Sequence, residues 1–244
     1  MICPVPATDG APAVRIASRY SLAVFPFLDG VPGRWGEPIG DDDRSRLLHM
    51  LAELHGVEPV SLGRVATTPI ELLWRAELEE ILADVNRPWT AGPHSAEARQ
   101  ALAAHLADIR GWVARWEALA SGVASGAAPS VVTHGEPHPG NLIRASDRLL
   151  LIDWDTVGLA PPERDLWMLD DGSPGRFAAY TAATGHPVDP AAIAVFRLTW
   201  TLADISGGAA MFRAEHTTDP ETESRWRGFL DTLSTGATAP YGRR

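Results

Sequence analysis

The segment of residues 131–155 constrains the fold of this chain more than any other stretch. It opens with two valines at 131–132, whose β-branched side chains favour a short strand. The loop at 137–140 contains two prolines and a glycine, so it is predicted to be tight and non-helical, because proline fixes φ and lacks a backbone donor. Residues 141–145 and 148–152 then predict the two short strands of a hairpin. A strand, a rigid loop and a hairpin therefore form the centre of the predicted fold.

This order of elements brings three oxygen-bearing side chains to one end of the hairpin. Glu136 lies in the loop, Asn141 opens the first hairpin strand, and Asp153 follows the second. Hard oxygen donors grouped in this way suit Mg²⁺, which takes few protein ligands, and therefore a phosphate-bearing substrate. An acid, an asparagine five residues later and an aspartate after the next hairpin also match the catalytic loop and metal-binding aspartate of kinase-like enzymes.

A zinc site is the alternative interpretation of the same loop. In a regular strand, the side chains of His134, Glu136 and His138 would share one face at a period of two. Two prolines interrupt such a strand, however, and zinc deaminases need a later pair of cysteines, whereas the only cysteine is Cys3. A zinc-dependent hydrolase that uses these three residues is therefore the less favoured hypothesis.

At these residues the sequence resembles the aminoglycoside phosphotransferase and choline kinase group of small-molecule kinases. The motif of that group is His-Gly-Asp-x-His-x-x-Asn, followed by a strand that ends Ile-Asp-Trp-acid. The matching residues are His134-Gly135-Glu136-Pro137-His138-Pro139-Gly140-Asn141 and then Ile152-Asp153-Trp154-Asp155. The resemblance implies that Glu136 occupies the catalytic-base position, that Asn141 and Asp153 hold Mg²⁺, and that His134 supports the loop. The base of the family is usually aspartate, and this chain has the longer glutamate.

The resemblance also implies an α+β, protein-kinase-like fold with ATP as the co-substrate. A mostly helical large lobe, built around the central β-hairpin, is expected at residues 31–244. Residues 1–30 are expected to hold a two-stranded remnant of the small lobe and the linker between the lobes. In the resembling family this linker meets the adenine ring, so Phe25 and Phe27 are candidate ATP-binding residues.

The sequence contains no lysine, and its basic residues, 21 in all, are arginines. Kinases of this fold hold the α- and β-phosphates of ATP with a lysine that lies near a glycine-rich loop. The glycines at 30–36 have the wrong spacing for that loop, and this stretch is predicted to be a surface loop. We therefore expect an N-terminally truncated member of the family with weak or no phosphotransfer activity. A non-catalytic protein that keeps the small-molecule cleft is the alternative.

Composition excludes several other classes of function. The net charge of −10 argues against nucleic-acid binding. It is compatible with a cationic acceptor, such as the aminoglycoside-like molecule that the resemblance implies, and solubility alone would explain it equally well. No run of about 18 apolar residues predicts a membrane span, and the N-terminus lacks the pattern of a signal peptide. A single cysteine fits a reducing cytoplasm. Two short strands at 13–16 and 21–25 predict an N-terminal hairpin whose unpaired edge favours self-association.

The rest of the chain is predicted to be mostly helical, and three aspartates in it or beside it are candidate functional residues. Asp155 follows the hairpin, and Asp204 lies on the otherwise apolar face of a helix, so both are candidate substrate contacts; a pair with an arginine is the alternative for Asp204. Asp165 resembles a family aspartate that supports the loop, and an ordinary acid in a first helical turn is its alternative. The helices are predicted from 41 to 55, from 68 (a capping box) to about 85, from 95 through 119 as one long helix, from 163 to 169, from 176 to 184, from 191 to about 213 and from 219 onward.

Overall fold

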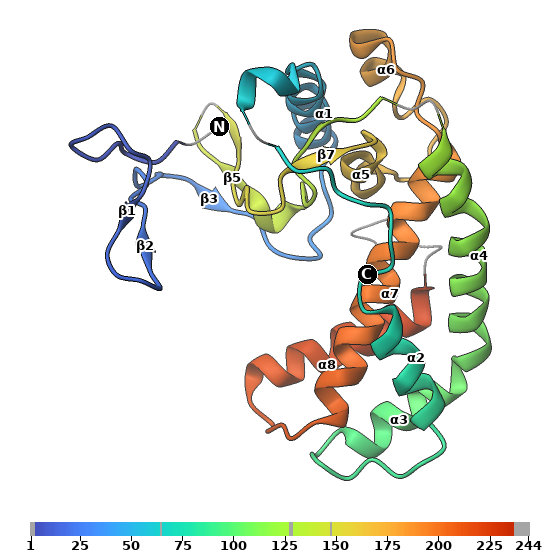
Figure 1. The fold of residues 1–244 in the computed structure, drawn as a ribbon. Helices are drawn as coiled ribbons and strands as arrows, with labels where there is room; N and C mark the ends of the chain where they lie inside the picture. Colours follow the sequence, from blue (N-terminus) through green and yellow to red (C-terminus); the bar gives the residue numbers. More distant parts are fainter. Residues whose placement is uncertain (1–2, 64, 127–128, 147, 237–244) are drawn as a thin grey trace.

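The computed structural model describes residues 3–63, 65–126, 129–146 and 148–236, which form short strands at one end and long helices at the other (Figure 1). The helices are α1 (Asp41–His55), α2 (Arg75–Asp84), α3 (Ser95–Ala104), α4 (Leu106–Ser125), α5 (Glu163–Leu166), α6 (Ala178–Thr184), α7 (Pro190–Arg213) and α8 (Pro220–Thr235). The strands are β1 (Val14–Arg15), β2 (Ser21–Leu22), β3 (Val31–Pro32), β4 (Val131–Thr133), β5 (Leu142–Arg144), β6 (Leu149–Leu151) and β7 (Gly158–Ala160). The expected α+β fold class is confirmed.

The predicted central hairpin is formed by β5 and β6, and it carries one strand more than expected. β3 pairs antiparallel with β5, with Val31 opposite Arg144, so the prediction of a surface loop at 30–36 is wrong at its start. The glycine at 33 explains the close approach, because a Cβ there would collide with the backbone carbonyl of Pro139. β4 pairs with β7 in a separate antiparallel sheet, so the loop that follows β4 begins at the end of this sheet.

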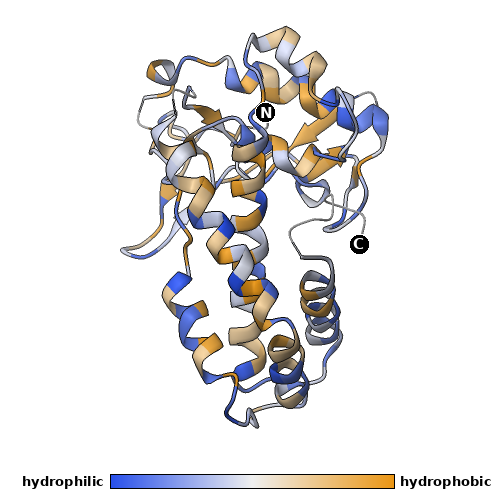
Figure 2. Cartoon of the chain, turned by 90° about the vertical axis from the view of Figure 1, so that its right-hand side faces the viewer, coloured by the Kyte–Doolittle hydropathy of each residue, from blue (hydrophilic) through white to orange (hydrophobic). Residues whose placement is uncertain are grey.

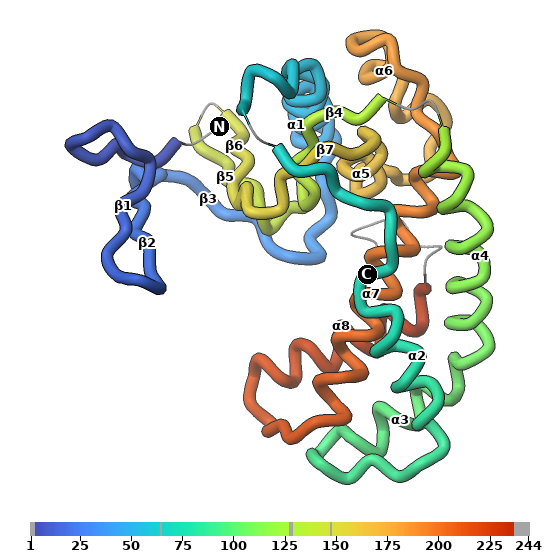
Figure 3. Tube along the Cα trace, in the orientation of Figure 1, coloured from blue at the N-terminus to red at the C-terminus, as the bar shows by residue number. Residues whose placement is uncertain are grey.

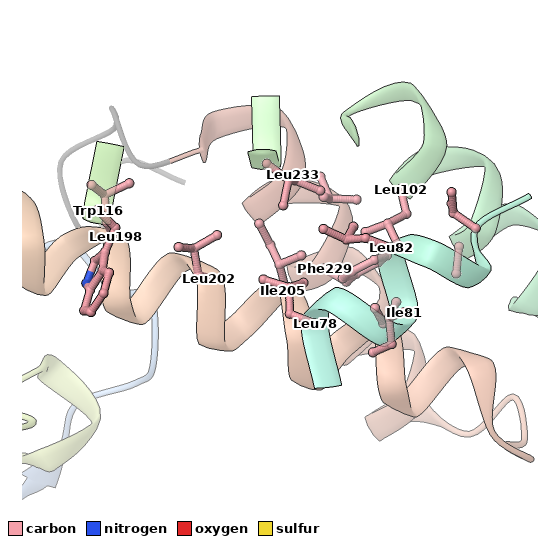
Figure 4. Packing of buried hydrophobic residues seen from close by; sticks show 14 of the residues in the cluster. Leu78, Ile81, Leu82, Leu102, Trp116, Leu198, Leu202, Ile205, Phe229 and Leu233 are labelled. Atoms are coloured by element: carbon pink, nitrogen blue, oxygen red, sulfur yellow. The ribbon is translucent and has the colours of Figure 1, made fainter. Parts of the chain in front are cut away.

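Helix α7 connects the two hydrophobic clusters of the fold. Its C-terminal part packs among α2, α3, α4 and α8, where Leu202, Ile205 and Phe229 are buried together (Figure 4). Its N-terminal part contributes Ile193 and Phe196 to a second cluster, with α1, α6 and the strands. The tube in Figure 3 follows α4 and α7 side by side along the helical part, and Figure 2 shows the apolar strands gathered at the other end.

Two helix predictions need correction. Thr68 does not cap a helix: its backbone N–H donates to the carbonyl of Leu159 at 2.9 Å, so the chain here runs extended along β7, and α2 begins only at Arg75. The long helix predicted from Ser95 is two helices, α3 and α4, which meet at His105. The Ser95 hydroxyl donates to the carbonyl of Phe212 at 2.7 Å, and this bond fixes the start of α3 against the end of α7.

The N-terminal hairpin forms as predicted but is shorter and lies outside both clusters. β1 and β2 are two residues each, and the hairpin projects away from the rest of the chain (Figure 1). Its apolar side chains are exposed, and Phe27, in the segment that follows, is 95% exposed. In the described part of the chain, no helix has both the length and the hydropathy that a membrane crossing requires.

Candidate active site

One buried carboxylate holds the backbone of the loop that follows β4. The side chain of Asp165 accepts the backbone N–H of His134 at 2.8 Å and that of Gly135 at 2.6 Å, and Asp165 is 0% exposed. Gly135 has a φ of +99°, a conformation that favours glycine over any residue with a Cβ. Asp165 therefore supports the loop, as the resemblance implied, and is not an ordinary acid of a first helical turn.

A histidine and a tyrosine extend this support into the core. Nε2 of His55, the last residue of α1, donates to Oδ2 of Asp165 at 3.1 Å, and Nδ1 of His55 lies 2.7 Å from the hydroxyl of Tyr180. Burial, and then the negative charge of Glu163, raises the pKa of Tyr180, so its hydroxyl stays protonated. Sequence reasoning missed both residues, because they lie 110 and 15 positions from Asp165 and carry no motif of their own.

His134 joins the loop to the end of the central hairpin. Its Nδ1 accepts the backbone N–H of Glu136 at 3.2 Å, so Nε2 carries the proton and donates to the carbonyl of Ile152 at 2.9 Å. Burial lowers the pKa of His134, which favours this neutral ring. Both ring nitrogens are thus occupied, and His134 has none left for a metal.

Asn141 connects the loop to Asp153. Its side-chain nitrogen donates to the backbone carbonyl of Glu136 at 2.9 Å. The backbone carbonyl of Asn141 accepts the backbone N–H of Ile152 at 2.9 Å. Asp153 follows at once with a φ of +65°, which is strained for an aspartate. The structure therefore brings the predicted residues 136, 141 and 153 to one end of the hairpin. A strained backbone persists only where surrounding contacts hold it in place, and such positions are common at functional sites.

The carboxylate of Glu136 lies among other negative charges. Burial, followed by the charges of Asp155 and Asp153, raises its pKa, and the Arg164 guanidinium opposes this rise. His138 lies nearby, with Nε2 3.9 Å from Oε2 of Glu136, and burial lowers the pKa of His138 to about 4. A carboxylate with a raised pKa accepts a proton more readily, which is the property of a general base.

A cavity of about 420 Å³ opens beside Glu136. The predicted substrate contact Asp204 lines it from α7, together with Trp200, so the structure brings Asp204 and Glu136 to the same cavity. Asp155 does not line it, nor do Phe25 and Phe27. The remaining walls come from the loop (Gly135), from Thr156, Arg164 and Trp167, from residues 68–75 and Leu78, and from Phe196, Thr199, Leu202 and Ala203 on α7.

The donor set of this end of the hairpin fits Mg²⁺ better than Zn²⁺. The amide nitrogen of Asn141 is used by the loop, so its oxygen and the exposed carboxylate of Asp153 are the groups that suit a hard cation. Within the residues that the structure describes, no three His, Cys, Asp or Glu side chains are placed to hold a metal. Since His134 also spends both ring nitrogens on the backbone, the zinc interpretation loses its first ligand.

A helical lobe around a short hairpin, with an acid, an asparagine and an aspartate at its end, defines the class of kinase-like phosphotransferases. The profile of the phosphotransferase enzyme family matches residues 3–196. The chain belongs to that family, and the resemblance stated from the motif is confirmed. A search of curated protein sequences finds no significant match.

Solved structures with the same fold include phosphotransferases of several kinds. A spectinomycin phosphotransferase bound to ADP and spectinomycin superposes with a TM-score of 0.76 at 18% identity, over 96% of this chain and 72% of the other. A choline/ethanolamine kinase family protein from Mesorhizobium loti gives a TM-score of 0.56 at 15% identity, over 99% and 77%. A microcompartment-associated aminopropanol kinase gives 0.57 at 19%, over 97% and 74%. At these identities the likeness shows the fold.

Proposed function

We propose that this chain transfers the γ-phosphoryl group of ATP to a hydroxyl of a small molecule. The observation that carries the proposal is the position of Asn141, whose hydrogen bonds join the backbone of Glu136 to the residue before Asp153. In this arrangement Glu136 orients or deprotonates the acceptor hydroxyl, and Asn141 and Asp153 hold Mg²⁺. An ion held there would supply positive charge against the negative charge that develops on the phosphate oxygens. Membership of the family and the ADP-bound neighbour support this assignment.

The cavity favours a cationic acceptor. Glu71 and Asp204 line it together with Glu136, and Trp74, Trp167 and Trp200 are among its aromatic walls. Carboxylates attract a protonated amine, and the face of an indole ring adds a cation–π attraction. An amino alcohol or an amino sugar combines such an amine with the hydroxyl that the reaction needs.

The proposed turnover is slow, for two reasons that lie in the sequence. The chain has no lysine to hold the α- and β-phosphates of ATP, and catalysis of this kind depends mainly on positioning and charge. Glu136 is also one methylene longer than aspartate, and a displacement of about 1 Å at a reacting centre can cost roughly 100-fold in rate. Phe25 and Phe27 remain the proposed adenine contacts. Their exposure, 55% and 95%, favours weak ATP binding.

The test is a phosphotransfer assay with the full chain, ATP and MgCl₂. The acceptor panel contains spectinomycin, choline, ethanolamine and 1-amino-2-propanol, and mass spectrometry detects the phosphorylated product. We expect slow, Mg²⁺-dependent product with at least one acceptor, and its loss in Glu136→Gln. Glu221→Gln, at an exposed position on α8 that does not line the cavity, is the matched control. The absence of product with every acceptor, at any ATP concentration, would refute the transferase assignment.

A non-catalytic binding protein is the second candidate, and the missing lysine favours it. This candidate predicts that an acceptor raises the melting temperature without any turnover of ATP. Thermal denaturation with and without each acceptor, run beside the transfer assay, separates the two functions.

We also propose that the exposed N-terminal hairpin mediates self-association. Val14 and Leu22 are exposed on the two-residue strands, and Ile16 is exposed directly after β1. The outer edges of these strands have no partner strand among the described residues. An unpaired, apolar edge favours pairing with another chain. The single cysteine, Cys3, is exposed and forms no disulfide, which is compatible with the cytoplasm as the proposed location.

A further inference from the structure

Two arginines line the cavity beside Glu136, and their charges are balanced in different ways. Arg75 donates to Glu79 at 2.8 Å and also forms an ion pair with Glu117. Arg164 makes no ion pair with a described carboxylate within 4.0 Å, although it is partly buried. A buried charge without a paired counter-charge is costly, so its retention needs a reason.

The hydrogen bonds of Arg164 use only part of its capacity. Nη1 donates to the hydroxyl of Thr133 at 2.8 Å, and Nη2 donates to the backbone carbonyl of Thr156 at 3.0 Å. Both acceptors are neutral, and a guanidinium has five N–H donors in a planar fork. The charges of Asp165 and Glu136 act to raise the pKa of Arg164 against the effect of burial, but neither carboxylate forms an ion pair with it within 4.0 Å.

The loop is shaped to bring this guanidinium against the catalytic end of the cavity. A Cβ at position 135 would collide with the guanidinium of Arg164, and Gly135 avoids the collision. Arg164, Gly135 and Glu136 line the same cavity. The site therefore combines a proton acceptor with a positive fork that matches the oxygens of a phosphoryl group.

We propose that Arg164 binds the oxygens of the phosphoryl group as it reaches the acceptor. The inference rests on the proposed function. In that reaction the acceptor oxygen forms a bond to the γ-phosphorus, the bond from that phosphorus to the leaving oxygen of ADP breaks, and the hydroxyl proton passes to Glu136. Arg164 stabilises the charge on the transferred group and on the phosphate-ester product. In a chain without lysine, this residue places positive charge where the phosphoryl group arrives.

The experiment measures binding of inorganic phosphate to the full chain by isothermal titration calorimetry, without ATP or acceptor. We expect Arg164→Met to weaken phosphate binding by about tenfold or more, as the loss of charge-assisted hydrogen bonds implies. Arg164→Lys keeps the charge and loses the planar fork of donors, so its affinity for phosphate is expected to lie between that of the parent and that of Arg164→Met. Arg225→Met is the matched control and is expected to bind phosphate as the parent does, because that arginine is exposed on α8 and does not line the cavity.

Thr133→Val tests whether the effect is only structural. It removes the hydroxyl that accepts from Arg164 and keeps the charge, so phosphate binding is expected to fall less than in Arg164→Met. An equal loss in both variants would overturn the inference, as would a folded Arg164→Met protein that binds phosphate like the parent. Undetectable phosphate binding by the parent, or equal binding of acetate, would also overturn the assignment to a phosphoryl group.

The outcome separates this inference from the proposed function. Phosphate binding that depends on Arg164, with no transfer to any acceptor, would retain the anion site and refute the transferase. Transfer at the parental rate in Arg164→Met would retain the transferase and refute the role of Arg164.

Discussion

The loop after β4 and the N-terminal hairpin both consist of short irregular backbone, yet they are held in opposite ways. In the loop, the backbone N–H groups of His134 and Gly135 reach one carboxylate that is wholly buried. In the hairpin, the backbone bonds are local, such as Ile16 to Tyr20 at 3.1 Å, and the apolar side chains face solvent. A buried polar network over-determines the first region, whereas the second has no core beneath it.

The loop after β4 is expected to contribute more to the free energy of unfolding than the N-terminal hairpin. A fully satisfied buried network is rigid, and each missing partner leaves the others with a desolvation penalty. An exposed two-stranded hairpin contributes little, because two strands alone are marginal in water. Substitutions in the loop are therefore expected to have large effects, and substitutions in the hairpin small ones.

The largest effect is expected for Asp165→Ala. The substitution leaves two buried N–H groups and the ring of His55 without their acceptor, so the free energy of unfolding is expected to fall by about 3–5 kcal/mol. Urea denaturation followed by circular dichroism measures this loss. Glu221→Ala, at an exposed ion pair with Arg225, is the control and is expected to cost less than about 1 kcal/mol. Similar losses of unfolding free energy in the two variants would contradict the prediction that the buried network of the loop is a main source of stability.

The next largest effect is expected from His138, whose lowered pKa should make the free energy of unfolding depend on pH. Its pKa is about 4 in the folded chain because the ring is buried, against 6.5 for an exposed histidine. Below pH 6.5 the unfolded chain takes up a proton that the folded chain does not, so stability is lost as the pH falls toward 4, by at most about 3 kcal/mol. His138→Gln is expected to flatten this slope in urea denaturation between pH 7 and pH 4. His49→Gln, at an exposed histidine, should leave the slope intact; equal slopes in His138→Gln and the parent would contradict the prediction.

Asp153→Gly is expected to separate stability from function. Glycine adopts the φ of +65° without strain, so the free energy of unfolding is expected to rise by about 1 kcal/mol. The same change removes a proposed Mg²⁺ ligand, so any Mg²⁺-dependent transfer should disappear. Asp155→Gly is the control for stability, because Asp155 does not have a positive φ, and it should gain nothing. A loss of stability in Asp153→Gly would show that the carboxylate itself holds the hairpin end.

Much of the site could be predicted from the sequence because its signals are local. The strand, the proline-containing loop and the hairpin follow from residues within 131–155, and α7 and α8 begin where an aspartate caps a helix before proline, at Asp189 and Asp219. The side chains of both aspartates accept backbone N–H groups, as caps should.

The rest depends on contacts between distant residues, which no local pattern carries. The bond from His55 to Asp165 spans 110 positions. Residues 68–71 have a good capping-box sequence, but the pairing of residues 67 and 68 with β7 overrides that preference. β3 is only two residues long and gains its place from β5, so a strand could not be predicted from Val31 and Pro32 alone.

The smallest effect on stability, and the sharpest test of the comparison, is expected for Phe27→Ser. The side chain is 95% exposed, so its loss should change the free energy of unfolding by less than about 0.5 kcal/mol. If the hairpin and its following segment mediate self-association, the substitution should nevertheless shift sedimentation toward the monomer at high protein concentration, because it removes apolar surface from the contact. Val60→Ser is the matched control, since Val60 is also exposed but lies elsewhere in the chain, and it should leave the sedimentation unchanged. A parent chain that stays monomeric at every concentration would refute the proposed role, whereas a large loss of stability in Phe27→Ser would place this segment in the cooperative fold.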